Sequence, residues 1–242
     1  MHSPNKKNAI KNSFNKALPT YDGYCDLQLR VGKRLLSKIE FKTETLPTLL
    51  DLGCGTGLIT EMFVQKIPHA TFDAVDMADQ LLVKAEHRLS PLGVRVYEAN
   101  FDHLNIAKKF DIIFSNLSLH WSQCFNTLLS NLKSALNPKG MLAFTIPLLG
   151  TFAELRPLGH MDHFLDLSDV LQQLNCLEYD IKVAQVEEIK LHFESTRATL
   201  ESIKYTGTNC VFKSRKAGLH GKALLRTPIH DLTYVIGYFI VS

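Results

Sequence analysis

The sequence predicts an α/β protein built around a parallel sheet. Between residues 49 and 146, short apolar runs alternate with segments of helical periodicity, which is the pattern of consecutive βαβ units. The first apolar run ends in an acidic residue and opens into a loop with glycine at every second position. The chain has 242 residues, of which 45% are hydrophobic and 21% are charged, as is usual for a single globular α/β domain with additions.

The elements of this sheet follow one another in regular order. Strands are expected at 49–52, 71–75, 95–98, 110–114 and 141–146, with helices near 58–67, 78–90 and 122–136 between them. The run Asn137-Pro138-Lys139-Gly140 predicts a turn before the fifth strand.

The segments on either side of this region carry weaker signals. Residues 1–15 are rich in Lys and Asn and predict little regular structure, whereas 20–40 have the apolar spacing of an amphipathic helix. After Pro147 the pattern changes, and the expected elements are a mostly helical region at 148–180, a sixth strand at 186–193, a helix at 196–205, a mobile segment at 207–227 rich in Gly, Lys and Arg, and a terminal strand at 232–241.

Composition narrows the function classes. No apolar run approaches the roughly 20 residues that span a bilayer, and the polar N-terminus has no apolar core of a signal peptide. Five cysteines are scattered without C-x-x-C or metal-ligand spacing, which predicts reduced thiols in a cytoplasmic protein without a metal site. The net charge of +3 gives no argument for nucleic acid as a partner.

The glycine loop predicts a nucleoside site without a phosphate in the loop. Gly53, Gly55 and Gly57 follow a G-x-G-x-G spacing, which differs from the G-x-G-x-x-G of dinucleotide enzymes. Asp51 just before the glycines disfavours a phosphate, because like charges would meet. S-adenosylmethionine fits instead, with its amino group near Asp51, and Cys54 supplies only a small side chain in the loop.

The string D-x-G-C-G-T-G resembles motif I of the class I S-adenosylmethionine-dependent methyltransferases. The resemblance implies a Rossmann-like, seven-stranded, mostly parallel sheet with an antiparallel last strand. It also implies a single domain over 1–242, with N-terminal lid helices at 1–45, a cofactor-binding core at 46–147, and substrate-side helices, a basic insertion and the closing strands at 148–242.

Asp76 has two possible roles. It ends the second strand, nineteen residues after Gly57, where an acidic side chain can accept hydrogen bonds from both ribose hydroxyls. It is also a suitable N-cap for the helix at 78–90. With the ribose at Asp76, Met77 would lie beside the adenine.

Residues after the third and fourth strands complete the expected cofactor site. In the family an Asp commonly stands at the position of Asn100, whose amide oxygen can still accept from the adenine amino group; an ordinary turn residue is the alternative. Phe101 would offer its backbone N–H to the ring. Asn116 lies at the carboxyl end of the fourth strand, where ligands bind in open α/β sheets. His120 is either a general base or, as we favour, a packed side chain beside Trp121.

Further segments resemble one subfamily, the malonyl-acyl-carrier-protein O-methyltransferases that start biotin synthesis. They are Phe14, Ala17, Tyr21-Asp22, Gln28, 115–121, 144–155, 207–209 and 232–234. The resemblance covers most of the chain, whereas 156–180 diverges.

That resemblance implies methyl transfer from S-adenosylmethionine to the free carboxylate of a malonyl thioester, carried by an acyl carrier protein or by coenzyme A, with S-adenosylhomocysteine as the second product. A carboxylate is already ionised at pH 7, so we expect neither a general base nor a metal. Tyr21 would belong to a lid over both ligands; an aromatic residue that only packs between helices is the alternative. Something cationic should orient the carboxylate, and Arg30, Arg156 and Arg197 are candidates that no motif supports. We expect a monomer.

A basic run near the C-terminus is a candidate docking patch for an acidic carrier protein. It contains Lys213, Arg215, Lys216, Lys222 and Arg226 and no acidic residue. A solvated basic loop and an RNA-binding segment are the alternatives.

The sequence allows three other hypotheses about the function of the chain. The core would also serve a methyltransferase acting on another small molecule or on RNA, although no extra RNA-binding module is visible. A non-catalytic scaffold of the same fold is disfavoured because Asp51, the glycines and Asp76 are all present. The glycine spacing argues against an NAD-dependent oxidoreductase.

Overall fold

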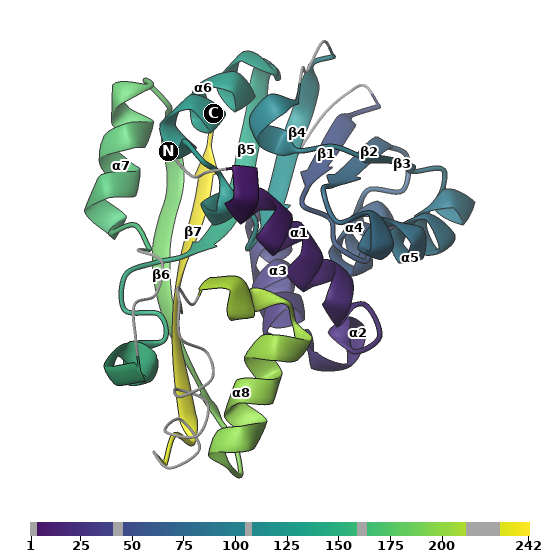
Figure 1. The fold of residues 1–242 in the computed structure, drawn as a ribbon. Helices are drawn as coiled ribbons and strands as arrows, with labels where there is room; N and C mark the ends of the chain where they lie inside the picture. Colours follow the sequence, from purple (N-terminus) through teal and green to yellow (C-terminus); the bar gives the residue numbers. More distant parts are fainter. Residues whose placement is uncertain (1–3, 41–45, 105–107, 159–163, 212–227) are drawn as a thin grey trace.

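The computed structural model describes residues 4–40, 46–104, 108–158, 164–211 and 228–242, and a sheet of seven strands lies at its centre (Figure 1). The strands are β1 (Thr48–Leu52), β2 (Thr71–Asp76), β3 (Arg95–Glu98), β4 (Phe110–Asn116), β5 (Leu136–Pro147), β6 (Ile181–His192) and β7 (Asp231–Val241). Their order across the sheet is β3-β2-β1-β4-β5-β7-β6.

Helices connect and cover these strands. The α-helices are α1 (Pro4–Ala17), α2 (Tyr21–Tyr24), α3 (Asp26–Lys38), α4 (Leu58–Lys66), α5 (Asp79–Leu89), α6 (Phe125–Ser134), α7 (Leu167–Cys176) and α8 (Thr196–Tyr205). Short 3₁₀ helices are η1 (Ser90–Leu92), η2 (Phe101–His103), η3 (Leu119–Trp121), η4 (Ala153–Leu158) and η5 (Thr208–Val211).

The strand directions confirm the predicted sheet. Strands β1 to β5 pair in parallel, and β7 lies antiparallel between β5 and β6. The chain winds outward from β1 in both directions, to β2 and β3 on one side and to β4 and β5 on the other. The carboxyl ends of β1 and β4 therefore form the switch point where open α/β sheets bind ligands.

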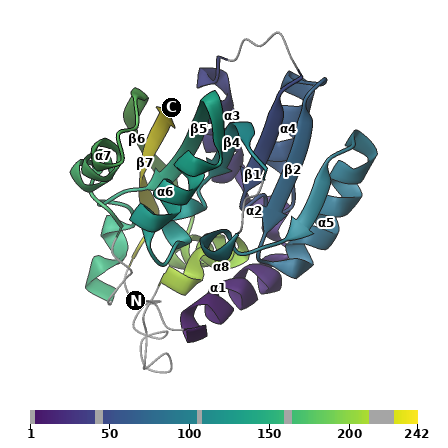
Figure 2. The ribbon, with the colours of Figure 1, turned by 90° about the horizontal axis from the view of Figure 1, so that it is seen from above.

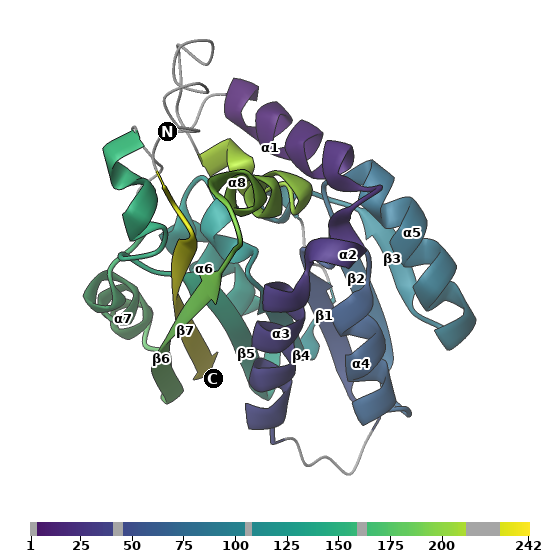
Figure 3. The ribbon, with the colours of Figure 1, turned by 90° about the horizontal axis from the view of Figure 1, so that it is seen from below.

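Both faces of the sheet are buried, which explains the continuous apolar runs of its strands. Successive residues of β1 point to opposite sides: Leu49 packs with α3, α4 and α5, whereas Leu50 packs with α6 and α7. Figures 2 and 3 show the sheet between these two groups of helices. A third apolar cluster, around Phe152, Ile203 and Leu232, joins η4 and α8 to the start of β7.

The N-terminal segment differs from the prediction, because residues 4–17 form the helix α1. Its apolar stripe consists of Ile10, Phe14 and Ala17, which recur at helical spacing; Ile10 and Ala17 are 4% and 2% exposed. The many Lys and Asn residues obscured this stripe. They lie on the polar face, where two of the lysines meet carboxylates of the core.

Three boundaries in the rest of the chain also differ. In the described part of 148–180, η4 and α7 are the only helices, since Gly150 and Phe152 have φ values of +109° and +58°, which no right-handed helix contains. Strand β6 begins before residue 186, because pairing with β7 holds residues that show no apolar alternation. The predicted turn at 137–140 is an irregularity within β5: the register steps from Leu136 to Met141, and Lys139 has a φ of 67°.

Substituting two glycines should separate backbone strain from overpacking. Gly57 and Gly93 have φ values of +79° and +75°, and a Cβ at Gly57 would lie 2.8 Å from Cδ1 of Leu89, whereas a Cβ at Gly93 would meet nothing within 4 Å. Gly93→Ala should lower the free energy of unfolding by about 1 kcal/mol, and Gly57→Ala by a further 1–3 kcal/mol or so. Urea unfolding at unchanged m-value measures both, and equal losses would contradict the predicted overlap with α5.

Candidate active site

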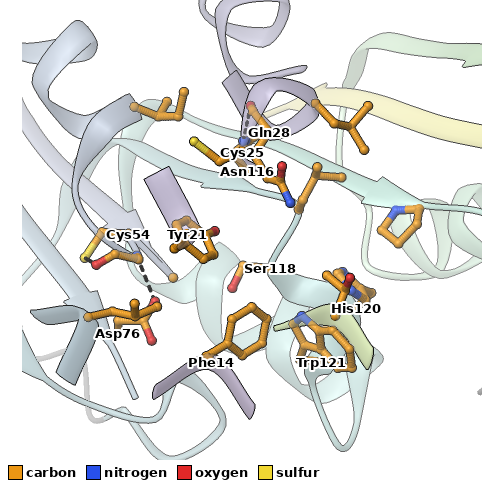
Figure 4. A pocket seen from close by; sticks show the side chains of 18 of the residues that line it. Phe14, Tyr21, Cys25, Gln28, Cys54, Asp76, Asn116, Ser118, His120 and Trp121 are labelled. Carbon is orange, nitrogen blue, oxygen red and sulfur yellow. Dashed lines mark hydrogen bonds between the residues drawn. The ribbon is translucent and has the colours of Figure 1, made fainter. Parts of the chain in front are cut away.

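A cavity lies at the carboxyl ends of β1, β2 and β4, at the switch point of the sheet (Figure 4). The predicted residues that line it are Tyr21, Asp51, Gly53, Cys54, Gly55, Asp76, Met77, Phe101 and Asn116. Gly57 and Asn100 are not among its lining residues. Residues that the sequence did not single out for the site complete the wall, and they include Phe14, Gln28, Ser118, Phe152 and Tyr234.

The glycine loop is held in place by β2. The backbone N–H groups of Gly53 and Cys54 both donate to the carbonyl of Val75, at 2.8 and 3.0 Å. Gly53 has a φ of +78°, and a Cβ there would lie 1.9 Å from the Oγ of Ser118. Only glycine allows this approach, so the motif is required by the packing of the loop against the segment after β4.

Asp76 fixes the other side of the loop. Its carboxylate accepts from the backbone N–H of Gly55 at 2.9 Å and of Ala78 at 2.8 Å. Burial raises the pKa of Asp76, against the effect of these backbone donors. The carboxylate thus supports the start of α5, and its oxygens keep acceptor capacity. The ribose contact predicted for it is compatible with this support and stays a prediction.

Asp51 is the most deeply placed charge of the cavity. Its residue is 3% exposed, and Thr60 Oγ1 donates to its carboxylate at 2.6 Å. Burial raises the pKa of Asp51 to about 7, although the Thr60 hydrogen bond opposes this and Asp76 adds to it. A carboxyl that is costly to ionise at neutral pH gains from a nearby cation.

The side chain of Asn100 forms a hydrogen bond within its own turn. Its Oδ1 accepts from the backbone N–H of Asp102 at 3.0 Å, and it caps η2. This is the alternative role that the sequence left open, and the adenine contact stays a prediction. Phe101 and Met77 both face the cavity and offer apolar surface to an aromatic ring.

Asn116 ties the cavity wall together. Its Nδ2 donates to the backbone carbonyl of Gln28 at 2.9 Å, and its Oδ1 accepts from Thr145 Oγ1 at 2.9 Å. The side chain therefore joins α3, β4 and β5 at the end of the sheet.

Tyr21 lies over the glycine loop (Figure 4). A Cβ at Gly55 would lie 3.6 Å from its hydroxyl oxygen. The neighbouring Asp22, which the sequence did not assign to the site, holds this arrangement: it accepts from Thr56 Oγ1 at 2.6 Å and from Arg88 Nη2 at 3.0 Å. Asp22 thus links α2, the helix that carries Tyr21, to the glycine loop and to α5.

Helix α1 forms another part of the cover. Its Phe14 lines the cavity and meets Trp121 edge-on, with ring centroids 5.8 Å apart. Lys7 pairs with Asp102 at 3.1 Å, so the helix is anchored to the loop after β3. Lys11 pairs with Asp79 at 2.9 Å and with Glu98 at 2.6 Å.

The side of the cavity away from the glycine loop is aromatic. It is lined by Phe14, Trp121, Phe152, Phe164 and Tyr234, with His120 beside them. The rings of His120 and Trp121 lie 4.5 Å apart, as the packed interpretation of His120 requires. Such a wall offers apolar surface to a ligand and excludes water.

None of the three arginines proposed for a substrate carboxylate lines the cavity. Arg30 pairs with Glu187 at 3.0 Å, and Arg197 pairs with Glu201 at 2.9 Å. Arg156 is exposed on η4. The predicted docking residues Lys213, Arg215, Lys216, Lys222 and Arg226 lie outside the described residues, as does most of the segment expected to be mobile.

The donors, acceptors and shape of the cavity fit S-adenosylmethionine. Carboxylates stand at the ends of β1 and β2, a glycine loop allows close approach, and Met77 and Phe101 offer apolar surface. Fold and site together define a class I S-adenosylmethionine-dependent methyltransferase.

Comparison with known proteins agrees with this class and narrows it. Residues 50–142 match the family described as "Methyltransferase domain". Malonyl-[acyl-carrier protein] O-methyltransferase 2 of Coxiella burnetii is 32% identical over 239 residues, covering 98% of this chain and 96% of that protein. Malonyl-[acyl-carrier protein] O-methyltransferase of Priestia megaterium is 27% identical, covering 84% and 82%. The chain belongs to the malonyl-acyl-carrier-protein O-methyltransferase family, and its cofactor is S-adenosylmethionine.

Solved structures share the fold at low identity. The YcgJ protein of Bacillus subtilis has a TM-score of 0.68 at 13% identity, with 88% of this chain and 97% of that chain covered. Precorrin-6y C5,15-methyltransferase of Geobacter metallireducens has a TM-score of 0.50 at 14% identity, covering 86% and 87%.

The described residues contain neither a cluster of metal ligands nor a membrane-spanning helix. No group of three or more His, Cys, Asp or Glu side chains within the described ranges is arranged to hold a metal ion. No helix in that part of the chain is long and apolar enough to cross a membrane.

Cofactor affinity should depend on pH through Asp51. A cation binds only to the ionised carboxylate, and the α-amino group of a ligand keeps its charge below about pH 8. With the pKa of Asp51 near 7, lowering the pH from 7 to 5.5 should raise the Kd for S-adenosylmethionine by about tenfold, since binding must release a proton. Calorimetry across this range measures the effect.

The matched variant is Asp51→Asn, which cannot ionise. It should bind more weakly than wild type at pH 7 and lose the pH dependence between 5.5 and 7. If the variant keeps the wild-type slope, the cofactor ammonium is not near Asp51.

Proposed function

We propose that this chain transfers the methyl group of S-adenosylmethionine to the free carboxylate of a malonyl thioester on an acyl carrier protein. The observation that carries the proposal is the match along nearly the whole chain to the Coxiella burnetii protein of that name. The product is a malonyl methyl ester, which hides the charge and primes pimeloyl synthesis for biotin. Malonyl-coenzyme A would offer the same reacting group.

The reaction asks little acid–base chemistry of the protein. The cofactor supplies an electrophilic methyl group on a sulfonium, and the substrate carboxylate, with a pKa near 4, is ionised at pH 7. No proton has to move when the methyl group is transferred. His120 therefore needs no basic role, in keeping with the tilted contact of its ring with Trp121.

The protein's contribution is alignment and the exclusion of water. Opposite charges on substrate and cofactor neutralise each other during transfer, which a dry cavity of low dielectric favours. The aromatic wall and the cover made by α1 and α2 supply that environment. We assign the binding of the cofactor to Asp51, Asp76 and the glycine loop. Tyr21 would close over the cofactor as a positioning residue.

Mass spectrometry of the acceptor tests the reaction. Malonyl-carrier protein incubated with enzyme and S-adenosylmethionine should gain one methylene, about 14 Da. Acetyl-carrier protein, which lacks the free carboxylate but has the same thioester and carrier, should gain nothing. Proven cofactor binding without a mass gain on the malonyl form would refute the proposed substrate.

We propose that the carrier protein docks on the basic run at 213–226. Charge reversal at Lys213, Arg215 and Lys216 should lower kcat/KM for malonyl-carrier protein about tenfold or more at low salt, since complementary charge speeds association. The same variant should treat malonyl-coenzyme A as the wild type does. An unchanged kcat/KM on the carrier-bound substrate would exclude this run as the docking patch.

A further inference from the structure

Gln28 presents an unused amide to the cavity. It lies in the first turn of α3, and its backbone is fixed because its carbonyl accepts from Asn116 Nδ2 at 2.9 Å. Its side-chain oxygen Oε1 is buried and has no hydrogen-bond partner among the described residues. Figure 4 shows Gln28 next to Asn116, which is the residue that ends β4.

A buried polar atom without a partner is costly unless a ligand completes it, and the oxygen Oε1 of Gln28 is such an atom. Rotating the carboxamide by half a turn exchanges its oxygen with its NH₂ group, so the same position can offer one acceptor or two donors. The structural framework uses only the backbone of Gln28, and the side chain is left available for a bound molecule.

The charges around the cavity indicate which group of a ligand the amide can bind. Among the described lining residues, the carboxylates of Asp51 and Asp76 lie on the loop side, and no Lys or Arg is present. A substrate carboxylate near those two side chains would be repelled. Gln28 lies on α3, across the switch point from the loop, and it is neutral.

We infer that the carboxamide of Gln28 binds the substrate carboxylate that receives the methyl group. This assignment rests on the proposed function. Nε2 donates to one carboxylate oxygen; the other oxygen forms the new bond to the methyl carbon, the bond from that carbon to sulfur breaks, and its electron pair stays on sulfur. The products are a methyl ester and a neutral thioether, and no proton is transferred.

A neutral donor suits this reaction better than an arginine. A guanidinium within the cavity would repel the sulfonium and would compete with it for the carboxylate charge. A single amide hydrogen bond orients the carboxylate and leaves its negative charge available to attack.

Two variants test the inference. Gln28→Glu keeps the size of the side chain but replaces the donor with a negative charge, and Gln28→Met keeps the length without polar atoms. Both should raise KM for malonyl-carrier protein by about 10- to 100-fold, Glu more than Met, with the Kd for S-adenosylmethionine changed less than threefold. Gln65→Glu, on the exposed surface of α4, makes the same charge change elsewhere and should alter neither value.

A change of preference gives the sharpest readout. With S-adenosylhomocysteine present, wild type should bind malonyl-carrier protein more tightly than its terminal carboxamide analogue, and Gln28→Glu should reverse that order, because a carboxylate accepts from the analogue's NH₂. An unreversed order, or a Kd for the cofactor raised tenfold with KM unchanged, would overturn the assignment. Wild-type enzyme that binds the malonyl form preferentially but does not methylate it would instead overturn the proposed function.

Discussion

The site depends on the hydrogen bonds that join the carboxyl ends of β1 and β2. The carbonyl of Val75 accepts hydrogen bonds from two N–H groups of the glycine loop. The carboxylate of Asp76 accepts from a third N–H of this loop and from the N–H of Ala78, the residue before α5. The loop, the start of α4 and the start of α5 therefore occupy fixed positions before any ligand arrives. A preorganised loop avoids the ordering cost that a flexible loop would incur on binding.

Ion pairs link the helices that cover this loop to the rest of the protein. Carboxylates after β2 and β3 meet the lysines of α1, and Asp22 on α2 meets Lys84 and Arg88 on α5. The pairs of Lys11 and Asp22 are partly exposed, and such pairs contribute only about 0–1 kcal/mol each, whereas the side chains of Lys7 and Asp102 are 14% and 8% exposed. Together they hold α1 and α2 in place over the cavity. Ile10 and Phe14 of α1 add apolar contacts, and both line the cavity.

The parts of the structure that the sequence predicted are those governed by local rules. Short apolar runs predicted β1 to β4 to within two residues at each end, and the glycine spacing with Asp51 and Asp76 predicted the cofactor side of the cavity. The substrate side was not predictable, because Phe152, Phe164 and Tyr234 meet only through tertiary packing. Gln28 was among the residues that resemble the subfamily. That its side-chain oxygen has no hydrogen-bond partner can be known only from the positions of its neighbours. Helix α1 was missed because its partners on the core are distant in sequence, although its apolar spacing could have revealed it.

The position of β7 also has a consequence for how the molecule is assembled. In the described sheet β6 pairs with β7 alone, and β7 in turn pairs with β5. A chain made from its N-terminus produces β6 first, so this twelve-residue strand has no partner until β7 follows it. Contacts between segments so far apart form slowly, because a long loop has to close first. The substrate side of the cavity, which includes Tyr234 and Ile236 of β7, is therefore among the last parts of the protein to form.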